Sequence, residues 1–438
     1  MSVKNNPPVQ KPAANVFPEL FSGCSSLCLG ITFFFLVAFF AVFPAKAQIL
    51  QYPMGGVIYS ITPGPDGAYW GAEYYADNIG RIDTNGIFTI PFQFTSNSGP
   101  YSIIVGPDSN IWFTELLVDK IGRISPGTNG SWTNGVLTEF PIHPGVPNAN
   151  SSPCGITSGP DGNLWFTEYD GDLIGVMNTN GQTLHEYGGF MRATNQLRQI
   201  AAGPDGYLWF CEYTYGTIGR MSTSGALTEI PLGLTNILGT NYWYSNSQPL
   251  DIVAGPDGAM WFTETSSNRI GRLTVNSNYS DYVLPTISGS SYYNYSQVPY
   301  YITVGGDGNL WFTEYISGNV SRITTNGFIT EFPTPEGSYL TGIASGRDKN
   351  IWFYEYSVSY IAEFLLPTLT SSINSNGQLV LTWPVTATDY VLQGNTNLAT
   401  TNWTNVTSPP LTVISNQYVY TNTASGIEFF RLFQFAIP

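Results

Sequence analysis

The sequence GPDGNLWFTE at residues 159–168 decides the fold of this chain. Its Pro-Asp-Gly unit predicts a tight turn, because proline presets φ and glycine tolerates a left-handed conformation. The Leu-Trp-Phe run that follows is typical of a buried strand. Variants of the phrase occur seven times, 41 to 53 residues apart, with the first glycine at positions 64, 106, 159, 203, 255, 305 and 346. A strand-rich repeat of that period predicts a β-propeller with one four-stranded blade per repeat.

Each repeat contains four segments that are typical of strands. In the second repeat these segments are residues 102–105, 111–115, 120–124 and 136–141. The seventh repeat has no fourth segment before Pro367, but residues 49–53 (ILQYP) match the fourth-strand sequence LTEFP at 137–141. We therefore expect the N-terminal strand to complete the last blade and close the ring, which removes the sheet edges. The predicted class is all-β, with a seven-bladed β-propeller over residues 48–366 and a small β-sandwich after it.

The two ends of the chain depart from the repeat. Residues 1–47 hold an apolar run at 27–43, a lysine-bearing arm before it and Ala-Lys-Ala after it, which is the layout of a secretory signal peptide. A retained anchor is the alternative, because about 17 residues is the lower limit for crossing a bilayer. Residues 367–438 alternate short strand-like runs with polar turns and predict a small β-sandwich. We therefore expect a secreted protein, periplasmic or extracellular, with no other membrane segment.

Composition narrows the function classes. The 438 residues carry 15 Lys and Arg against 30 Asp and Glu, a net charge of −15, which argues against nucleic acid as a partner. Only two histidines are present, so a histidine-rich metal site is excluded. Outside the signal segment, Cys154 and Cys211 either form a disulfide or remain buried thiols.

The repeats resemble the virginiamycin B lyase (streptogramin lyase) family. The resemblance covers about residues 49–366 and rests on the motifs GPDGNLWFTE (159–168), GPDGAMWFTE (255–264), IGRI (121–124) and LTEFP (137–141). The C-terminal module is similar, through LTW, YVLQGNTNL and FFRL, to fibronectin-type modules of secreted bacterial proteins. That second resemblance implies contact with a cell surface or matrix.

The lyase resemblance implies a site at the rim of the propeller channel. In the family two histidines lie there, one of them the acid or base, together with two glutamates, and the glutamates hold Mg²⁺. The histidine positions are Tyr300 and Thr341 here, one glutamate position is Tyr339, and only Glu355 matches the family. If an acid or base remains, Tyr300 and Tyr339 are the candidates, although a phenol of pKa about 10 is a poor match to neutral pH. Two interpretations stay open: a non-catalytic extracellular binding or scaffold module, and a Mg²⁺-dependent C–O lyase or related metal-dependent propeller enzyme.

The rim position lies five residues before the first glycine of each repeat. It is held by Tyr59, Tyr101, Cys154, Arg198, Leu250, Tyr300 and Thr341. The loop before the sixth repeat adds Tyr292 and Tyr293 between Asn and Ser residues, a composition that suits a glycan or another flat polar ligand. Packing of the loop on itself is the alternative. A small molecule or a glycan at the rim is therefore the expected partner.

The glutamate that ends each WFTE phrase has two interpretations. In five repeats the residue eight places later is an arginine, which predicts a cross-strand Glu–Arg pair. In the third and seventh repeats that arginine is absent, so Glu168 and Glu355 are the predicted metal ligands, with Mg²⁺ as the expected ion.

Overall fold

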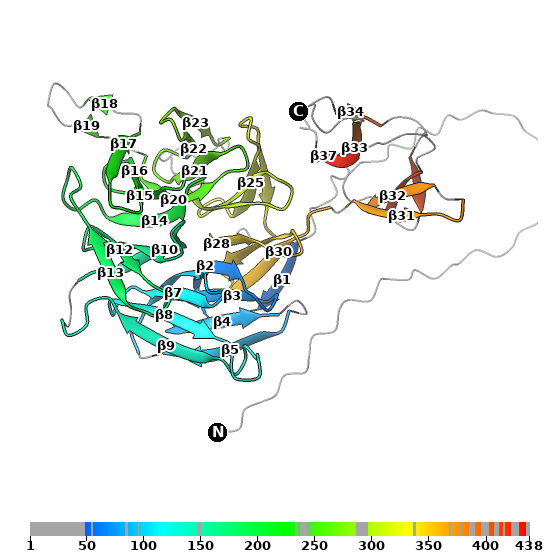
Figure 1. Cartoon of the computed structure of the whole chain (residues 1–438). Coiled ribbons are helices and arrows are strands. Elements are labelled where there is room, and N and C mark those ends of the chain that lie inside the picture. The colour runs from blue at the N-terminus through cyan, green and yellow to red at the C-terminus, as the bar shows by residue number, and fades with distance from the viewer. Residues whose placement is uncertain are drawn as a thin grey trace, which may run out of the picture. The chain divides into compact units, whose positions relative to one another are not determined.

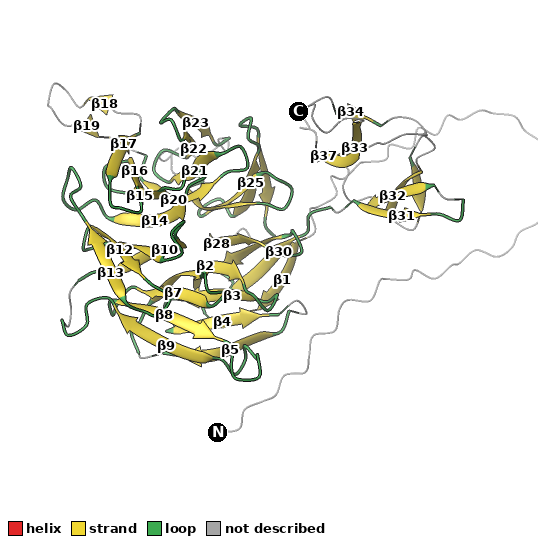
Figure 2. Ribbon diagram, viewed as in Figure 1, coloured by secondary structure: helices red, strands yellow, loops and turns green. Residues whose placement is uncertain are grey.

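The structure is a computed structural model, and it describes most of the chain between residues 49 and 434. The gaps in that range are residues 54–55, 84–85, 95, 147–149, 233–234, 237–242, 245–246, 286–296, 336–338, 368, 377, 385–389, 396–402, 407–410, 415–416 and 422–428. The predicted signal segment and the tyrosines Tyr292 and Tyr293 lie outside the described residues. All regular elements in the described part are strands (Figure 2). That part contains no helix long and apolar enough to cross a membrane.

Seven four-stranded antiparallel sheets occupy the described residues between Ile49 and Phe364 (Figure 1). In the order of their pairing the sheets contain β2 (Ile58–Pro63), β3 (Tyr69–Glu73), β4 (Asn78–Ile82) and β5 (Phe88–Gln93); β6 (Pro100–Val105), β7 (Ile111–Glu115), β8 (Lys120–Ser125) and β9 (Val136–Pro141); β10 (Pro153–Ser158), β11 (Leu164–Glu168), β12 (Leu173–Met177) and β13 (Thr183–Tyr187); β14 (Leu197–Ala202), β15 (Leu208–Glu212), β16 (Thr217–Met221) and β17 (Leu227–Pro231); β20 (Pro249–Ala254), β21 (Ala259–Glu264), β22 (Arg269–Thr274) and β23 (Tyr279–Val283); β24 (Pro299–Val304), β25 (Leu310–Glu314), β26 (Asn319–Ile323) and β27 (Ile329–Pro333); and β28 (Leu340–Ser345), β29 (Ile351–Glu355), β30 (Tyr360–Phe364) and β1 (Ile49–Pro53). A short pair, β18 (Thr235–Asn236) and β19 (Trp243–Tyr244), lies between β17 and β20.

The sheets form a closed ring. The first strands contact one another in the cycle β2, β6, β10, β14, β20, β24, β28 and back to β2. The N-terminal strand β1 pairs with β30, with Ile49 opposite Phe364 and Pro53 opposite Tyr360. The predicted all-β propeller, with its last blade completed by the N-terminal strand, is therefore confirmed.

The tryptophan of each repeat anchors its blade against the next one. Trp70 of the first blade packs with Ile103 and Phe113 of the second, and this arrangement recurs around the ring. Each indole N–H also donates a hydrogen bond to the aspartate of its own turn, over 2.9–3.1 Å in six blades and 3.4 Å in the seventh. A buried indole thus keeps its one polar group satisfied while its ring excludes water between blades.

The predicted cross-strand Glu–Arg pair is wrong. The hairpin between the second and third strands has a four-residue turn, so Glu115 faces Lys120, and Arg123 faces Trp112. The same register places the other arginines opposite tryptophans on the face of the sheet away from the glutamate. In four blades the arginine pairs instead with the aspartate of the turn, over 2.7 Å in three of them and 3.6 Å in the fourth.

After the propeller strands in the sequence, the chain forms two further small sheets, the C-terminal β module. One sheet contains β31 (Thr370–Ile373), β32 (Leu379–Pro384), β36 (Gln417–Thr421) and β35 (Thr412–Ile414), and the other contains β34 (Thr404–Asn405), β33 (Tyr390–Asn395) and β37 (Phe429–Gln434). Leu392 of the second sheet shares an apolar cluster with Leu381, Trp383 and Tyr420 of the first. Two sheets around one cluster fit the predicted sandwich.

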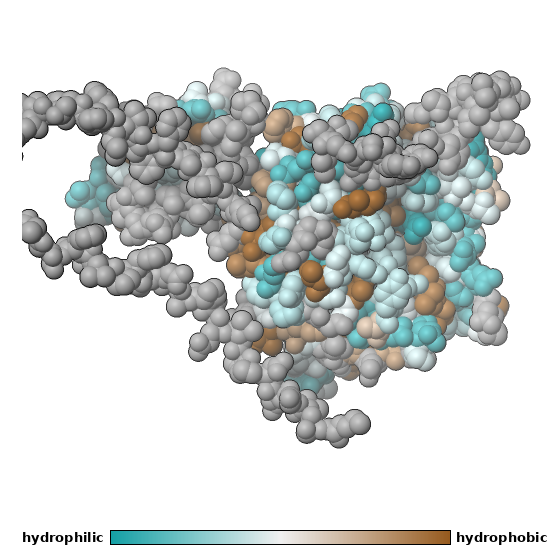
Figure 3. Space-filling view, turned by 180° about the vertical axis from the view of Figure 1, so that it is seen from behind, coloured by the Kyte–Doolittle hydropathy of each residue, from teal (hydrophilic) through white to brown (hydrophobic). Residues whose placement is uncertain are grey.

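On the face drawn in Figure 3, hydrophobic patches are small and separated by hydrophilic residues.

The aspartate of the turn should contribute unequally to stability in different blades. In the fourth blade Asp205 accepts from the Trp209 indole at 3.0 Å and pairs with Arg220 at 2.7 Å. In the third blade Asp161 accepts from the Trp165 indole at 2.9 Å, but Val176 replaces the arginine. Asp205→Asn should lower the free energy of unfolding by about 1–2 kcal/mol through loss of the charged pair. Asp161→Asn should cost less than about 0.5 kcal/mol.

Urea denaturation of the two variants and the parent chain, followed by tryptophan fluorescence, measures this difference. Equal losses in both variants would show that the arginine adds nothing to the turn.

Candidate functional site

The rim positions coincide with an irregularity in every first strand. In each of the seven sheets the register between the first and second strands shifts at or next to the rim residue, for example between Pro153 and Ile156 around Cys154. A bulge of this kind leaves residues unpaired and redirects their side chains. The sequence alone placed the positions but did not indicate the bulges.

The threonine of WFTE holds the bulge in place. Thr167 Oγ1 accepts the Gly155 N–H at 2.8 Å within its own blade and donates to the carbonyl of Arg198 in the next blade at 2.6 Å. Thr114 and Thr263 bridge in the same way to the carbonyls of Cys154 and Tyr300. The repeated threonine therefore fixes the rim residue of the neighbouring blade.

Three predicted rim residues belong to aromatic clusters. Tyr59 stacks on Tyr101, with 5.4 Å between ring centroids and 25° between ring planes. The ring centroids of Tyr300 and Tyr315 lie 5.1 Å apart, and those of Tyr315 and Tyr339 lie 5.0 Å apart. The structure thus brings Tyr300 and Tyr339 together through a tyrosine that the sequence analysis did not single out.

Arg198 is the one rim cation. Its guanidinium lies over the rings of Tyr169 and Tyr213, at 4.5 and 4.8 Å from their centroids. Within the described part of the chain Arg198 forms no ion pair with a carboxylate, and its Nε has no hydrogen-bond partner. The titratable groups around it include the phenols of Tyr101, Tyr169 and Tyr300 and the thiol of Cys154. We call Tyr59, Tyr101, Tyr169, Arg198, Tyr213 and Tyr300 the rim site.

The other rim positions are closed. Cys154, Leu250 and Thr341 are buried, as is Tyr101 of the rim site, and Thr341 donates its hydroxyl to the carbonyl of Ile58 at 2.6 Å. Burial raises the pKa of the Cys154 thiol to about 11, against the lowering effect of Arg198, so this cysteine is no nucleophile at neutral pH. Cys154 and Cys211 are both free and buried, so the disulfide alternative is not realised.

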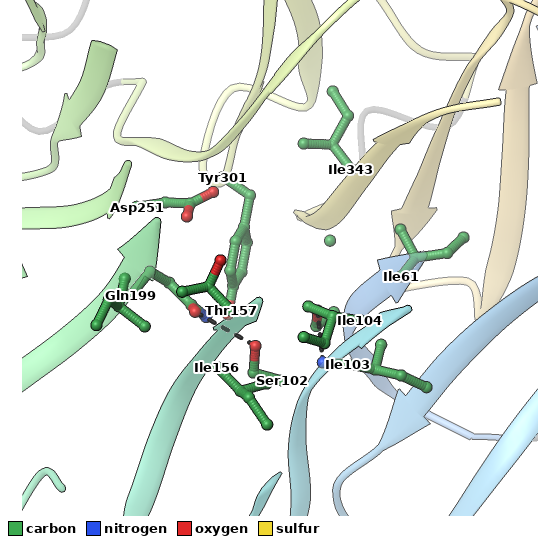
Figure 4. A pocket seen from close by; sticks show the side chains of 13 residues that line it. Ile61, Ser102, Ile103, Ile104, Ile156, Thr157, Gln199, Asp251, Tyr301 and Ile343 are labelled. Carbon is green, nitrogen blue, oxygen red and sulfur yellow. Dashed lines mark hydrogen bonds between the residues drawn. The ribbon is translucent and has the colours of Figure 1, made fainter. Parts of the chain in front are cut away.

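A small cavity of about 170 Å³ lies in the channel among the first strands (Figure 4). Its polar lining includes Ser102, Gln199, Asp251 and Tyr301. The Asp251 carboxylate accepts the N–H groups of Ile252 at 2.9 Å and Ile302 at 2.8 Å. Burial raises the pKa of Asp251 to about 7 against those hydrogen bonds. The sequence analysis missed Asp251, although it is the one carboxylate among the residues four places before the glycines of the repeats.

The seven WFTE glutamates are all buried, and the blades satisfy them differently. Glu314 accepts hydrogen bonds from Ser317, Asn319 and Ser321 of its own blade. Glu355 accepts one from Gln51 of the N-terminal strand at 2.5 Å. In the third blade Glu168 lies beside His143 and Glu186.

The residues present do not fit the Mg²⁺ site that the resemblance implies. Mg²⁺ requires several oxygen ligands in octahedral geometry. Glu355 keeps its bond to Gln51, and among the described residues it belongs to no group of three or more potential metal ligands. Tyr300 is also a poor candidate for the acid or base, because burial raises the pKa of its phenol above the ordinary value.

Two buried glutamates make stability dependent on pH. Burial raises the pKa of Glu115 to about 9, and the neighbouring Glu139 carboxyl adds to the rise; Glu212 behaves in the same way beside Glu229. The folded state therefore holds protons that the unfolded chain releases, so the free energy of unfolding should fall as pH rises from about 5 to 9. Glu115→Gln should flatten this fall and raise stability at pH 8 by on the order of 2 kcal/mol.

Glu314→Gln is the matched control, because it places an amide among three hydrogen-bond donors and should be destabilising at pH 5 and at pH 8. Urea midpoints at the two pH values measure both effects. An unchanged pH slope in Glu115→Gln would contradict the buried proton.

Comparison with known proteins places the chain in a family. The model of the virginiamycin B lyase family matches residues 43–236 and 146–366. A streptogramin B lyase structure is 31% identical, over 72% of this chain and 96% of that chain, with a TM-score of 0.61. Virginiamycin B lyase from Staphylococcus aureus is 30% identical, over 73% of this chain and 99% of that chain, also with a TM-score of 0.61.

More distant structures share the fold alone. The extracellular domain of a protein described as a hybrid two-component system of B. thetaiotaomicron is 13% identical, over 88% of this chain and 56% of that chain, with a TM-score of 0.56. No curated protein sequence matches the chain. The family match spans the whole ring of sheets, so the chain belongs to the virginiamycin B lyase family.

Proposed function

We propose that this chain is a secreted, non-catalytic member of its family that binds a small molecule or glycan at the rim site. The observation that carries the proposal is Arg198, a cation without a carboxylate partner among the described residues, held between the rings of Tyr169 and Tyr213. A guanidinium in that setting suits a carboxylate or another planar anion. Tyr59, half-buried and supported by stacking on the buried Tyr101, suits a flat ring of the same ligand.

The ligand class we favour is therefore a small organic anion with a flat ring, or an acidic oligosaccharide. A neutral glycan would leave the Arg198 charge uncompensated in a partly desolvated site, which is unfavourable. The C-terminal β module would connect the propeller to a cell surface or matrix.

The family activity needs groups that this rim lacks. Thr341, at one histidine position, donates its hydroxyl to the carbonyl of Ile58. Tyr300, at the other histidine position, has a raised pKa. Neither side chain accepts a proton at neutral pH, so a proton-abstracting elimination has no base there.

Arg198→Gln should weaken binding of an anionic probe by at least tenfold, because a charge-assisted hydrogen bond contributes about 1.5–3 kcal/mol. Isothermal titration with benzoate and benzamide, and with oligogalacturonate and a neutral glucan, measures the charge preference in two matched pairs. Arg192→Gln is the control, since Arg192 also stacks on a tyrosine, Tyr215, but outside the rim site. Equal binding of the charged and neutral probes would refute the role of Arg198.

Incubation of the whole protein with a type B streptogramin and Mg²⁺ should give no ring opening above a protein-free control. Mass spectrometry of the antibiotic follows the reaction. Ring opening that Glu355→Gln abolishes would replace the binding proposal with the lyase alternative.

A further inference from the structure

A group of three potential metal ligands, none of them a residue of the rim site, lies where two neighbouring blades meet. His143 follows β9 of the second blade, while Glu168 ends β11 and Glu186 lies on β13 of the third blade. Their nearest ligand atoms all lie within 4.8 Å of one another, and His143 Nε2 is 2.6 Å from Glu186 Oε1. In the part of the chain that the structure describes, this is the one such group of three.

The histidine ring is oriented toward the carboxylates. Ser151 Oγ lies 3.1 Å from His143 Nδ1, which leaves Nε2 on the side of Glu186. A hydrogen bond at one ring nitrogen that fixes the other is the usual outer-shell arrangement of a metal-binding histidine.

Like Glu73 and Glu115, Glu168 is a WFTE glutamate that the described residues leave without a hydrogen bond, and it is the one of the three that belongs to a group of potential metal ligands. Its side chain is fully buried, and neither carboxylate oxygen receives a hydrogen bond of acceptable geometry from a described residue. Burial raises the pKa of Glu168 to about 7, with the nearby Ser151 hydroxyl acting against the rise. A buried carboxylate without donors is costly unless a cation compensates it.

An ion pair with a protonated histidine does not supply hydrogen bonds to the Glu168 carboxylate. An ion pair between His143 and Glu186 leaves both oxygens of Glu168 without a partner. By contrast, Glu314 at the same position of the sixth blade is satisfied by three donors of its own blade. The third blade has Gly175 and Leu173 in place of the residues corresponding to Ser321 and Asn319.

We propose that His143, Glu168 and Glu186 bind a divalent transition-metal ion of the Zn²⁺ class. One imidazole nitrogen and two carboxylate oxygens form a ligand set typical of zinc, whereas Mg²⁺ and Ca²⁺ prefer oxygen alone. Ligand atoms on a tetrahedral zinc are about 3.3 Å apart, given bond lengths of about 2.0–2.1 Å, so small side-chain rotations complete the site.

Three protein ligands leave one position of a tetrahedral ion for water or another ligand. That position faces outward, because the side chains of His143 and Glu186 are each 26% exposed whereas Glu168 forms the floor of the site. The site uses no residue of the rim site, although Glu168 directly precedes Tyr169 in the sequence.

Zinc titration of the whole metal-free protein tests the proposal. We expect one Zn²⁺ bound per chain, a melting temperature that rises with Zn²⁺ and not with Mg²⁺, and at least a tenfold loss of affinity in His143→Gln. Glu168→Gln should show the same loss. Two variants serve as matched controls that should bind as the parent does: His185→Gln removes the other histidine of the chain, and Glu212→Gln alters the equivalent glutamate of the next blade.

Co²⁺ in place of Zn²⁺ identifies the donor atoms, since thiolate ligands from the four cysteines would give an intense charge-transfer band and nitrogen and oxygen ligands would not. Thermal melting of the metal-free variants shows whether each one folds. If Glu168→Gln does not fold, His143→Gln still tests the proposal, because it alters a partly exposed side chain. The proposal is overturned by the absence of zinc binding, by equal affinity in His143→Gln and the parent, or by a thiolate band.

Discussion

The hydrogen bond from each tryptophan indole to the aspartate of its turn is the contact on which the ring depends. It closes the hairpin between the first two strands and holds the indole plane against the next blade. Seven repetitions of one local contact therefore define seven interfaces, and the N-terminal strand completes the last of them. Since each blade packs its tryptophan on the next blade, stability is shared around the ring, and contacts across the channel, such as Ser102 to Gln199, add to it.

The opposite face of each sheet carries the buried glutamate, and here the blades differ. Phe113 needs the space over Gly122, where a Cβ would come within 2.0 Å of its ring, so the third strand offers no side chain to the carboxylate there. The surroundings of the carboxylate therefore differ between blades: Ser321 replaces the glycine in the sixth blade and donates to Glu314, and Tyr279 donates to Glu264 in the fifth. In the second and fourth blades a second carboxyl lies nearby, and neither oxygen of Glu115 receives a hydrogen bond from a described residue. Glu168 of the third blade lies beside a histidine, His143, which follows the last strand of the second blade.

The sequence predicted what depends on local turns and on the repeat: the sheets and the closing strand. It failed where a partner depends on hairpin register. An offset of eight residues indicated a Glu–Arg pair, but a four-residue turn places Arg123 opposite Trp112 instead. Glu168 was therefore singled out for an absent arginine that would not have reached it. The bulges around Cys154 and the approach of His143 from the neighbouring blade leave no signal in a single repeat, because they arise from contacts between blades.

Departures from the repeat are the informative positions in a chain built this way. Residues that recur in most blades, such as the tryptophan and the threonine, serve packing and hydrogen bonding between blades. Arg198 and His143 occur once, and each lies beside a group that the blade itself leaves unsatisfied or uncompensated: Arg198 carries a charge that no described carboxylate pairs with, and His143 faces the buried Glu168. Neither residue is needed to build a blade, since the other blades form without it. A ligand that supplies a negative charge at the first position and a metal ion at the second would complete both environments by ordinary electrostatics, a need that arises from the local chemistry of the two positions and not from the family likeness.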